Sequence, residues 1–203
     1  MRRDAITAIL AVVAFTLIFG LAYPLAMTGV AQLLFPDKAD GSRVTLDGRL
    51  VGSSLIGQDF RGDPAYFQSR PSQSEYAADT TFFSNSGPNS VEEREAVRES
   101  LAAYVKLEKP YDRSLTRADV PVDAVTMSGS GVDPHISAAN ARIQAHRIAA
   151  VRRLPLDQIE GLIDDHTDGR FLGLFGEPGV NVLRLNIALD EEAPLPTKRG
   201  GSR

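Results

Sequence analysis

The hydrophobic positions of this chain are unevenly distributed, and its N-terminal end is the extreme. No charged residue occurs from Ala5 to Phe35, and the first two thirds of this stretch are almost purely aliphatic and aromatic. Because a helix rises about 1.5 Å per residue, about 20 such residues cross the roughly 30 Å hydrocarbon core of a bilayer. The pattern predicts a short head at 1–4 and a transmembrane anchor helix at 5–35, with a kink or an end of its most buried part at Pro24.

A cleavable signal peptide is the alternative for this segment, because Arg2 and Arg3 precede it and a small-residue site follows at 29–31. The apolar run is longer than the roughly 7–15 residues usual for a signal sequence, which favours an uncleaved anchor. Lys38 and Arg43 follow the span and balance the two arginines before it, so the positive-inside rule indicates the orientation of the helix only weakly. The very short head favours a single-pass membrane protein with its N-terminus inside and its soluble domain on the outer side.

The rest of the chain alternates apolar runs with turn residues and predicts a soluble α+β domain over 36–190. Asp47-Gly48, set between two short apolar runs, predicts a β-hairpin. A polar but aromatic-rich stretch predicts an irregular, ordered loop rather than a disordered one. The expected elements after the hairpin are this loop at 57–89, helices at 90–108, 137–154 and 156–166, strands at 122–127 and 180–189, and a loose tail at 191–203.

Periodicity supports these assignments in different ways. Ser90 and Glu93 have the spacing of a capping box, and the apolar residues that follow recur at helical intervals. Leucine and isoleucine alternate with other residues from Leu183 to Leu189, which is the pattern of a half-buried strand. The predicted fold class is therefore a single N-terminal transmembrane helix followed by a soluble α+β domain.

Composition narrows the possible functions. The formal net charge is −4, so the chain lacks the basic excess typical of nucleic-acid binders, and no nucleic-acid partner is expected. The chain has no cysteine, which excludes disulfides, thiolate nucleophiles and cysteine-based zinc sites. The sequence also lacks a GxxxxGK[ST] phosphate loop, GxGxxG, HExxH and GxSxG, as well as the Asp-Lys-Thr-Gly phosphorylation sequence of a P-type ATPase. We expect no catalytic residues, no metal site and no enzyme activity of its own.

Two features remain as candidate sites. The helix at 137–154 carries several basic residues, which form a solvated face, pair with nearby acids, or face an acidic partner or phosphate. The segment Ser128–Ser137 is rich in small residues and lies directly before the start of that helix. Such an arrangement can present backbone N–H groups to an anion. A tight turn capped by Ser137 or Asp133 needs no ligand and is the favoured interpretation. His135, His146 and the third histidine are expected to be surface or packing residues.

Six segments in one order resemble the C subunit of the bacterial Kdp potassium-transporting ATPase. They are Gly52–Phe60, Tyr66–Ser72, Ser84–Asn89, Ser128–Ser137, Gln144–Ala149 and Val180–Asn186. The likeness extends from the N-terminal span to about Asp190, whereas the tail matches nothing.

The resemblance implies a non-catalytic accessory subunit of a high-affinity ATP-driven potassium import complex. Its partners would be a channel-like A subunit, a P-type B subunit that hydrolyses ATP, a small F subunit and membrane lipid. Members of the family are described as catalytic chaperones that raise the ATP affinity of the B subunit, and Gln144 matches a proposed nucleotide contact. Ser130 and Gly131 are the further candidate positions for that contact. No cofactor is expected to bind this chain firmly, and ATP would reach it only through the complex.

The nucleotide proposal conflicts with the expected topology, because ATP is cytoplasmic and a domain outside the membrane cannot touch it. We favour the outward placement, with the domain capping the outer mouth of the A subunit and any effect on ATP use indirect. An independent membrane-anchored binding or hydrolytic protein on the outer side remains the alternative function.

Overall fold

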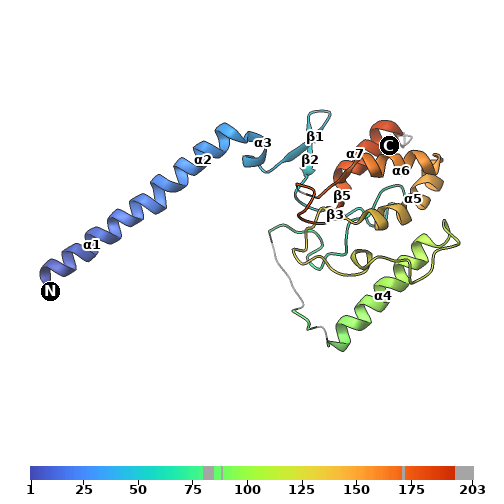
Figure 1. Ribbon diagram of the computed structural model, residues 1–203, viewed down its shortest axis with the longest axis horizontal. Coiled ribbons are helices and arrows are strands. Elements are labelled where there is room, and N and C mark those ends of the chain that lie inside the picture. The colour runs from blue at the N-terminus through green and yellow to red at the C-terminus, as the bar shows by residue number, and fades with distance from the viewer. Residues whose placement is uncertain (80–84, 88, 171, 195–203) are drawn as a thin grey trace, which may run out of the picture. The chain divides into compact units, whose positions relative to one another are not determined.

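The computed structural model describes residues 1–79, 85–87, 89–170 and 172–194 (Figure 1). The chain divides into two compact units, which are described separately. The first unit contains Met1–Thr45 and Arg49–Ser53, and the second contains Leu46–Gly48 and the chain from Ser54 onward.

The first unit is dominated by one long N-terminal helix. It consists of α1 (Arg2–Leu17), a π-helical turn η1 (Ile18–Ala22) and α2 (Tyr23–Leu34). None of its residues is buried, and by length and composition it is long and apolar enough to cross a membrane. The helix does not end at Pro24. Instead the wider π-helical turn precedes the proline, which has no N–H to donate to the helix.

A short helix and a hairpin complete this part of the chain. The helix α3 (Pro36–Ala39) is followed by β1 (Arg43–Leu46) and β2 (Arg49–Ser53), which form a two-stranded sheet. The turn residues Asp47 and Gly48 have φ values of 50° and 76°. Two consecutive positive φ angles are what a two-residue hairpin turn requires, so the predicted hairpin is confirmed.

The second unit contains four helices and a small antiparallel sheet in its described part. The helices are α4 (Val91–Glu108), α5 (Ala138–Arg152), α6 (Leu156–Asp165) and α7 (Val182–Glu192). The strands β3 (His135–Ile136), β4 (Thr167–Asp168) and β5 (Gly179–Asn181) pair in the order β3-β5-β4. In the register, His135 lies opposite Asn181 and Asp168 lies opposite Gly179. The predicted fold class is confirmed.

The apolar core of this unit lies among α5, α6 and α7. Its centre is fully buried and consists of Ile148, Ile159, Ile163, Leu185 and Leu189. In α6 the buried residues recur at three- and four-residue intervals, which is why the sequence pattern identified this helix. The predicted helices 90–108, 137–154 and 156–166 are confirmed within two residues at each end.

The strand predicted at 122–127 is wrong, and the one predicted at 180–189 is confirmed only for its first two residues. Residues 122–127 begin with a 3-10 turn, η2 (Val122–Ala124), because the amides of Val125 and Thr126 bond back to the Val122 carbonyl. At 180–189 the strand ends at Asn181, whose side chain caps α7 by accepting from the Arg184 amide at 3.2 Å. The alternating leucines are compatible with a helix as well, because positions three and four apart bury one face.

The irregular segment between the hairpin and α4 is ordered where the structure describes it. Residues 57–79 contain no helix or strand, yet Phe67 is completely buried. This confirms the expected loop for residues 57–79, whereas 80–84 and 88 lie outside the described residues. In the expected loose tail, α7 continues to Glu192, and residues 195–203 lie outside the described part.

Candidate functional site

Gln144 is buried in α5, where its side chain is bound to the main chain of the irregular segment. Its Oε1 accepts from the Gln68 amide at 2.7 Å, and its Nε2 donates to the Gln68 carbonyl at 3.1 Å. The Oε1 also accepts from Arg147 at 3.0 Å, and the Nε2 donates to Asn140 Oδ1 at 3.0 Å. An amide side chain has two donors and about two acceptor positions. All of these positions in Gln144 are occupied by the protein itself.

Asn186 in α7 repeats this arrangement on the neighbouring residue. Its Oδ1 accepts from the Phe67 amide at 2.8 Å, and its Nδ2 donates to the Phe67 carbonyl at 2.9 Å. Each amide therefore satisfies one residue of the segment in the way that a neighbouring strand would. We call Gln144 and Asn186, together with the main chain of Phe67 and Gln68, the amide clamp.

Arg147 extends the same network toward α4. Its side chain is completely buried, and it donates to the carbonyls of Pro64 and Tyr66 at 2.6 and 3.0 Å. Its Nε bonds to both carboxylate oxygens of Glu108, at 3.0 and 3.2 Å. One guanidinium therefore joins α4, α5 and the irregular segment, because its five donors spread over a planar fork.

Arg152 holds the adjacent part of the segment. Its Nε donates to the Ala65 carbonyl at 2.8 Å, and its guanidinium pairs with Asp190 at 2.7 Å. It also lies over the Tyr66 ring, 4.8 Å from the ring centroid. The main-chain groups of residues 64–68 are therefore paired largely with side chains rather than with a strand.

Burial shifts the titration of several groups near this network. It raises the pKa of the Glu108 carboxyl, an effect that the Arg147 guanidinium only partly offsets. It also raises the pKa of the Tyr104 hydroxyl, and it raises that of Tyr76 to about 12. Tyr104 donates to Asn140 Oδ1 at 2.7 Å, and both tyrosines stay protonated at physiological pH.

A cleft of about 410 Å³ lies between α4, α5 and the irregular segment, and Gln144 is one of its lining residues. Arg61 is the one charged side chain among the described residues that line it. That guanidinium is already held by Asp59 at 2.7 and 2.8 Å, and its hydrogen bond lowers the pKa of Asp59. A triphosphate is normally met by unpaired cations and backbone donors. The cleft suits a ligand with little charge better than a nucleotide.

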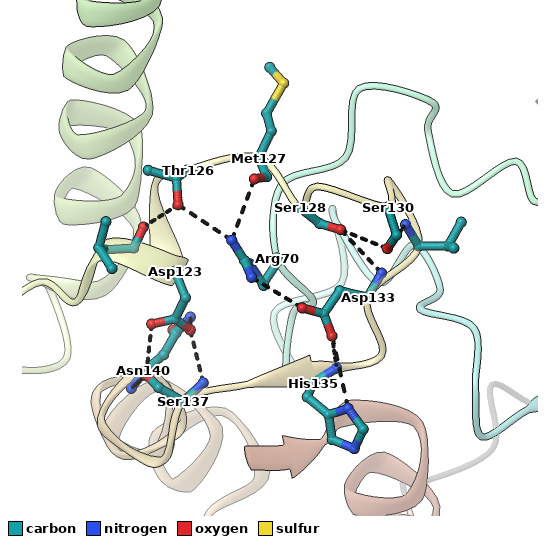
Figure 2. Close-up of polar contacts among 12 residues, drawn as sticks. Arg70, Asp123, Thr126, Met127, Ser128, Ser130, Asp133, His135, Ser137 and Asn140 are labelled. Atoms are coloured by element: carbon teal, nitrogen blue, oxygen red, sulfur yellow. Dashed lines mark hydrogen bonds and ion pairs between the residues drawn. The ribbon is translucent and has the colours of Figure 1, made fainter. Parts of the chain in front are cut away.

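The turn at 128–133 is stabilised by its own side chains and by the irregular segment. Ser128 bonds to Ser130 at 3.1 Å and accepts from the Asp133 amide at 3.3 Å (Figure 2). Gly131 has a φ of 74°, and a Cβ there would lie 2.7 Å from Ser74 Oγ. Ser130 and Gly131 are absent from the described lining of the cleft that Gln144 lines, so the structure does not bring the three candidate residues into one site.

The N-terminus of α5 already faces a carboxylate of the protein. Ser137 caps the helix by accepting from the Asn140 amide at 3.1 Å. Asp123 accepts from the Ser137 amide at 2.9 Å, from the Ser137 hydroxyl at 2.7 Å and from Asn140 Nδ2 at 3.0 Å (Figure 2). Asp123 thus occupies the position that an external anion would need. The turn interpretation is favoured here, with Ser137 as the cap.

The basic residues of α5 do not form one solvated face. Arg147 and Arg152 are buried and paired, whereas Arg142 makes an exposed pair with Asp164 at 2.8 Å. Among the histidines, His135 lies in β3 rather than in the helix, 3.6 Å from Asp168. His146 lies 4.0 Å from Asp112. Within the described ranges, no cluster of three ligating side chains has metal-site geometry.

Arg147, Glu108 and Asn186 are the residues of this network whose role sequence reasoning missed. Buried charges are rare, so a glutamate near a helix end and an arginine in a basic run are read as surface residues. A usable signal was present: Arg147 and Gln144 lie among small apolar residues in α5, so a helix face that contains them cannot be purely hydrophobic.

These features define a class: a protein whose described part has one helix able to span a membrane and an α+β domain with a buried polar clamp beside its apolar core. Residues 5–191 match the family described as KdpC, K+-transporting ATPase, c chain. The chain belongs to this family, which confirms the resemblance seen in the sequence.

Relatives from three bacteria cover most of the chain. A potassium-transporting ATPase KdpC subunit from Mycobacterium tuberculosis strain H37Rv is 48% identical over 94% of this chain and 99% of its own length. The subunits of the same name from Caldanaerobacter subterraneus and Koribacter versatilis are 45% and 41% identical. They cover 88% and 98% of this chain, and 92% and 100% of their own lengths.

Proposed function

We propose that this chain is a non-catalytic accessory subunit of a high-affinity ATP-driven potassium import complex. The observation that carries this proposal is the family match over residues 5–191, which includes the apolar helix and the folded domain alike. The part of the chain that the structure describes has one helix able to span a membrane, which cannot enclose an ion path, and the sequence has no phosphorylation motif of its own. The ion path and the ATPase site would therefore belong to the channel-like A subunit and the P-type B subunit, with a small F subunit alongside.

The soluble domain is proposed to lie outside the inner membrane and to cap the outer mouth of the A subunit. The very short head before the span supports this orientation. In that position the domain would stabilise the assembly, and its effect on ATP affinity would be transmitted through the complex. Gln144 would then act as a structural residue, which agrees with its complete set of hydrogen bonds within the protein.

The orientation can be tested with single cysteines because the chain has none. Ala150 is exposed on α5, so an Ala150→Cys variant gives an accessible thiol in the domain. We expect a membrane-impermeant maleimide to label Ala150→Cys in intact spheroplasts and to label an Asp4→Cys control only after lysis. The reverse pattern would place the domain in the cytoplasm and reopen direct nucleotide binding.

The role as a subunit is tested by co-purification. A tagged chain should retain the polytopic A and B subunits after detergent extraction, and deletion of the chain should abolish growth at low potassium. Recovery of the tagged chain alone, with normal potassium-limited growth of the deletion strain, would favour the independent binding or hydrolytic protein instead.

A further inference from the structure

The π-helical turn and the proline after it leave one backbone carbonyl of the long N-terminal helix without a donor. A π-helical turn pairs an amide with the carbonyl five residues earlier, and the Tyr23 amide accordingly bonds to the Ile18 carbonyl. In a regular α-helix the Tyr23 amide would bond to the Phe19 carbonyl instead. The next residue is Pro24, which has no N–H. Within this helix, all of which the structure describes, the Phe19 carbonyl therefore lacks a bond from both the fourth and the fifth following residue.

This carbonyl lies near the middle of the apolar span. The uncharged stretch extends from Ala5 to Phe35, so its midpoint is Gly20. At that depth a bilayer contains hydrocarbon and no water, and an unpaired backbone polar group is strongly unfavourable. A carbonyl that a proline frees in a membrane helix is satisfied by a side chain of the same helix, by water in a cavity or by a neighbouring helix.

The chain's own side chains do not supply the missing donor. A serine or threonine hydroxyl can bond to the carbonyl four residues before it, but the residue at that distance from Phe19 is Tyr23, whose hydroxyl lies at the far end of its ring. Thr16 lies on the N-terminal side of Phe19, whereas the carbonyls of a helix point toward its C-terminus. Lipid tails carry no hydrogen-bond donor. The group that pairs with this carbonyl must therefore come from another membrane-embedded protein segment.

The helix surface beside the Phe19 carbonyl is open to such a segment. Gly20, which shares the peptide bond with this carbonyl, has no side chain, and a Cβ built there would meet the Thr16 methyl group at 3.9 Å. Phe19 and Tyr23 on either side are 62% and 57% exposed. Glycine lets the backbones of two membrane helices approach closely, which brings a side-chain donor of one helix near the main chain of the other.

We infer that the Phe19 carbonyl accepts a hydrogen bond from a hydroxyl or amide side chain on a membrane-spanning helix of a partner subunit. The inference rests on the proposed function, because it requires the chain to work inside a complex with polytopic subunits. It makes the π-helical turn a recognition element of the anchor. Pro24 keeps the carbonyl free of an internal donor, and Gly20 lets the partner helix approach it. Lipid and a second copy of this chain are the alternative occupants, which the test separates.

Restoring a donor inside the helix tests the free carbonyl. Pro24→Ala supplies an N–H, so the helix itself should be at least as stable as in the wild type. Because one hydrogen bond between membrane helices changes their association on the order of threefold, Pro24→Ala should lower the polytopic subunits retained by a tagged full chain in detergent about threefold. Pro36→Ala is the control, since Pro36 begins α3, where the helix needs no N–H, and its retention should be unchanged. Unchanged retention in Pro24→Ala would overturn the inference.

A pair of substitutions at Tyr23 separates the hydrogen bond from the bend of the helix, because both keep Pro24. In Tyr23→Ser the new hydroxyl can reach back to the Phe19 carbonyl, whereas Tyr23→Ala removes the same ring and adds no donor. Retention of the polytopic subunits should be about threefold lower for Tyr23→Ser than for Tyr23→Ala. Equal retention in the two variants would show that the carbonyl is not the contact.

Photochemical cross-linking identifies the occupant. Benzoylphenylalanine in place of Phe19 should form an adduct with a polytopic subunit when the assembled complex is illuminated in the membrane. The same probe in place of Leu21, on the opposite side of the helix, should form fewer adducts. Adducts at Phe19 with lipid or a second copy alone, or equal adducts at both positions, would overturn the inference. If the wild-type chain retains no polytopic subunit, the proposed function fails as well; normal retention with no effect of Pro24→Ala removes this inference alone.

Discussion

The two faces of α5 are built on different principles. One face packs Ala141, Ala145 and Ile148 into the apolar core with α6 and α7. The other places Gln144 and Arg147, also buried, against an irregular stretch of backbone. The apolar face is held by contact area, whereas the polar face is held by hydrogen bonds to main-chain atoms that have no strand beside them.

This difference explains how an irregular segment can be as buried as a strand. A buried backbone amide or carbonyl must find a partner, and in most folds a neighbouring strand supplies it. Here Gln144, Asn186, Arg147 and Arg152 provide the partners for residues 64–68. Substitutions on the polar face should therefore lower the stability of the fold more than those on the apolar face, because each lost side chain leaves buried polar groups unpaired.

The largest effect is expected from Arg147→Met. The change leaves Glu108 as a buried charge without its partner and removes the donor to the carbonyls of Pro64 and Tyr66. Breaking a buried pair in this way typically costs about 3–5 kcal/mol. Chemical unfolding of the full chain in detergent measures this loss. Arg142→Met, which breaks an exposed pair with Asp164, should cost less than about 1 kcal/mol.

A double variant sharpens this prediction. Apolar residues can replace a buried ion pair without loss when the pair is all that is removed. Because Arg147 also serves two loop carbonyls, Arg147→Met with Glu108→Leu should recover only part of the lost stability. Full recovery would show that the carbonyl contacts contribute nothing, and the two faces of α5 would then differ little.

The apolar face is tested by Ile148→Ala. Ile148 is completely buried, so the truncation leaves a cavity and should cost about 2–5 kcal/mol in unfolding free energy. Ile143 on the same helix is only half-buried, and Ile143→Ala should cost clearly less. Equal losses at the two positions would contradict the packing described for α5.

A smaller effect is expected at the start of α5, where Ser137 caps the helix. Ser137→Ala removes the helix cap and the donor to Asp123, and N-cap removal typically costs about 1 kcal/mol. Ser90→Ala at α4 removes a cap at 3.2 Å and a donor to Glu92, but Glu92 is exposed whereas Asp123 is half-buried, so the change should cost less. Thermal unfolding would rank the two, and a larger loss at Ser90 would count against the role of Asp123.

The fold could be predicted where burial follows a simple period. The helix at Leu156–Asp165 has apolar residues at helical spacing. The hairpin between β1 and β2 is marked directly by its turn residues, Asp47 and Gly48. The strand predicted at 180–189 failed because alternating leucines satisfy two periods at once. Only tertiary packing against α5 and α6, together with the Asn181 cap, selects the helix.

The site could be predicted only in part. Gln144 was singled out through family resemblance, but its main-chain partner Gln68 lies 76 positions away in a segment without periodicity. Asn186 has an ordinary position among leucines in the sequence, and its role depends on the backbone of Phe67 beside it. Contacts between side chains and distant irregular backbone leave no local pattern, so only the structure revealed the clamp.

We propose that Gln144 is a structural residue of the amide clamp and does not contact nucleotide. The matched control is Asn186, which clamps the adjacent residue with the same geometry and does not line the described part of the cleft. The decisive measurement is the ATP KM of the assembled complex, taken together with complex yield, for Gln144→Ala and Asn186→Ala. We predict that both variants lower the yield and that both leave the KM within about twofold of wild type, since neither removes a bond to ATP. A several-fold rise in KM confined to Gln144→Ala, with yield preserved, would contradict this account and establish a direct nucleotide contact.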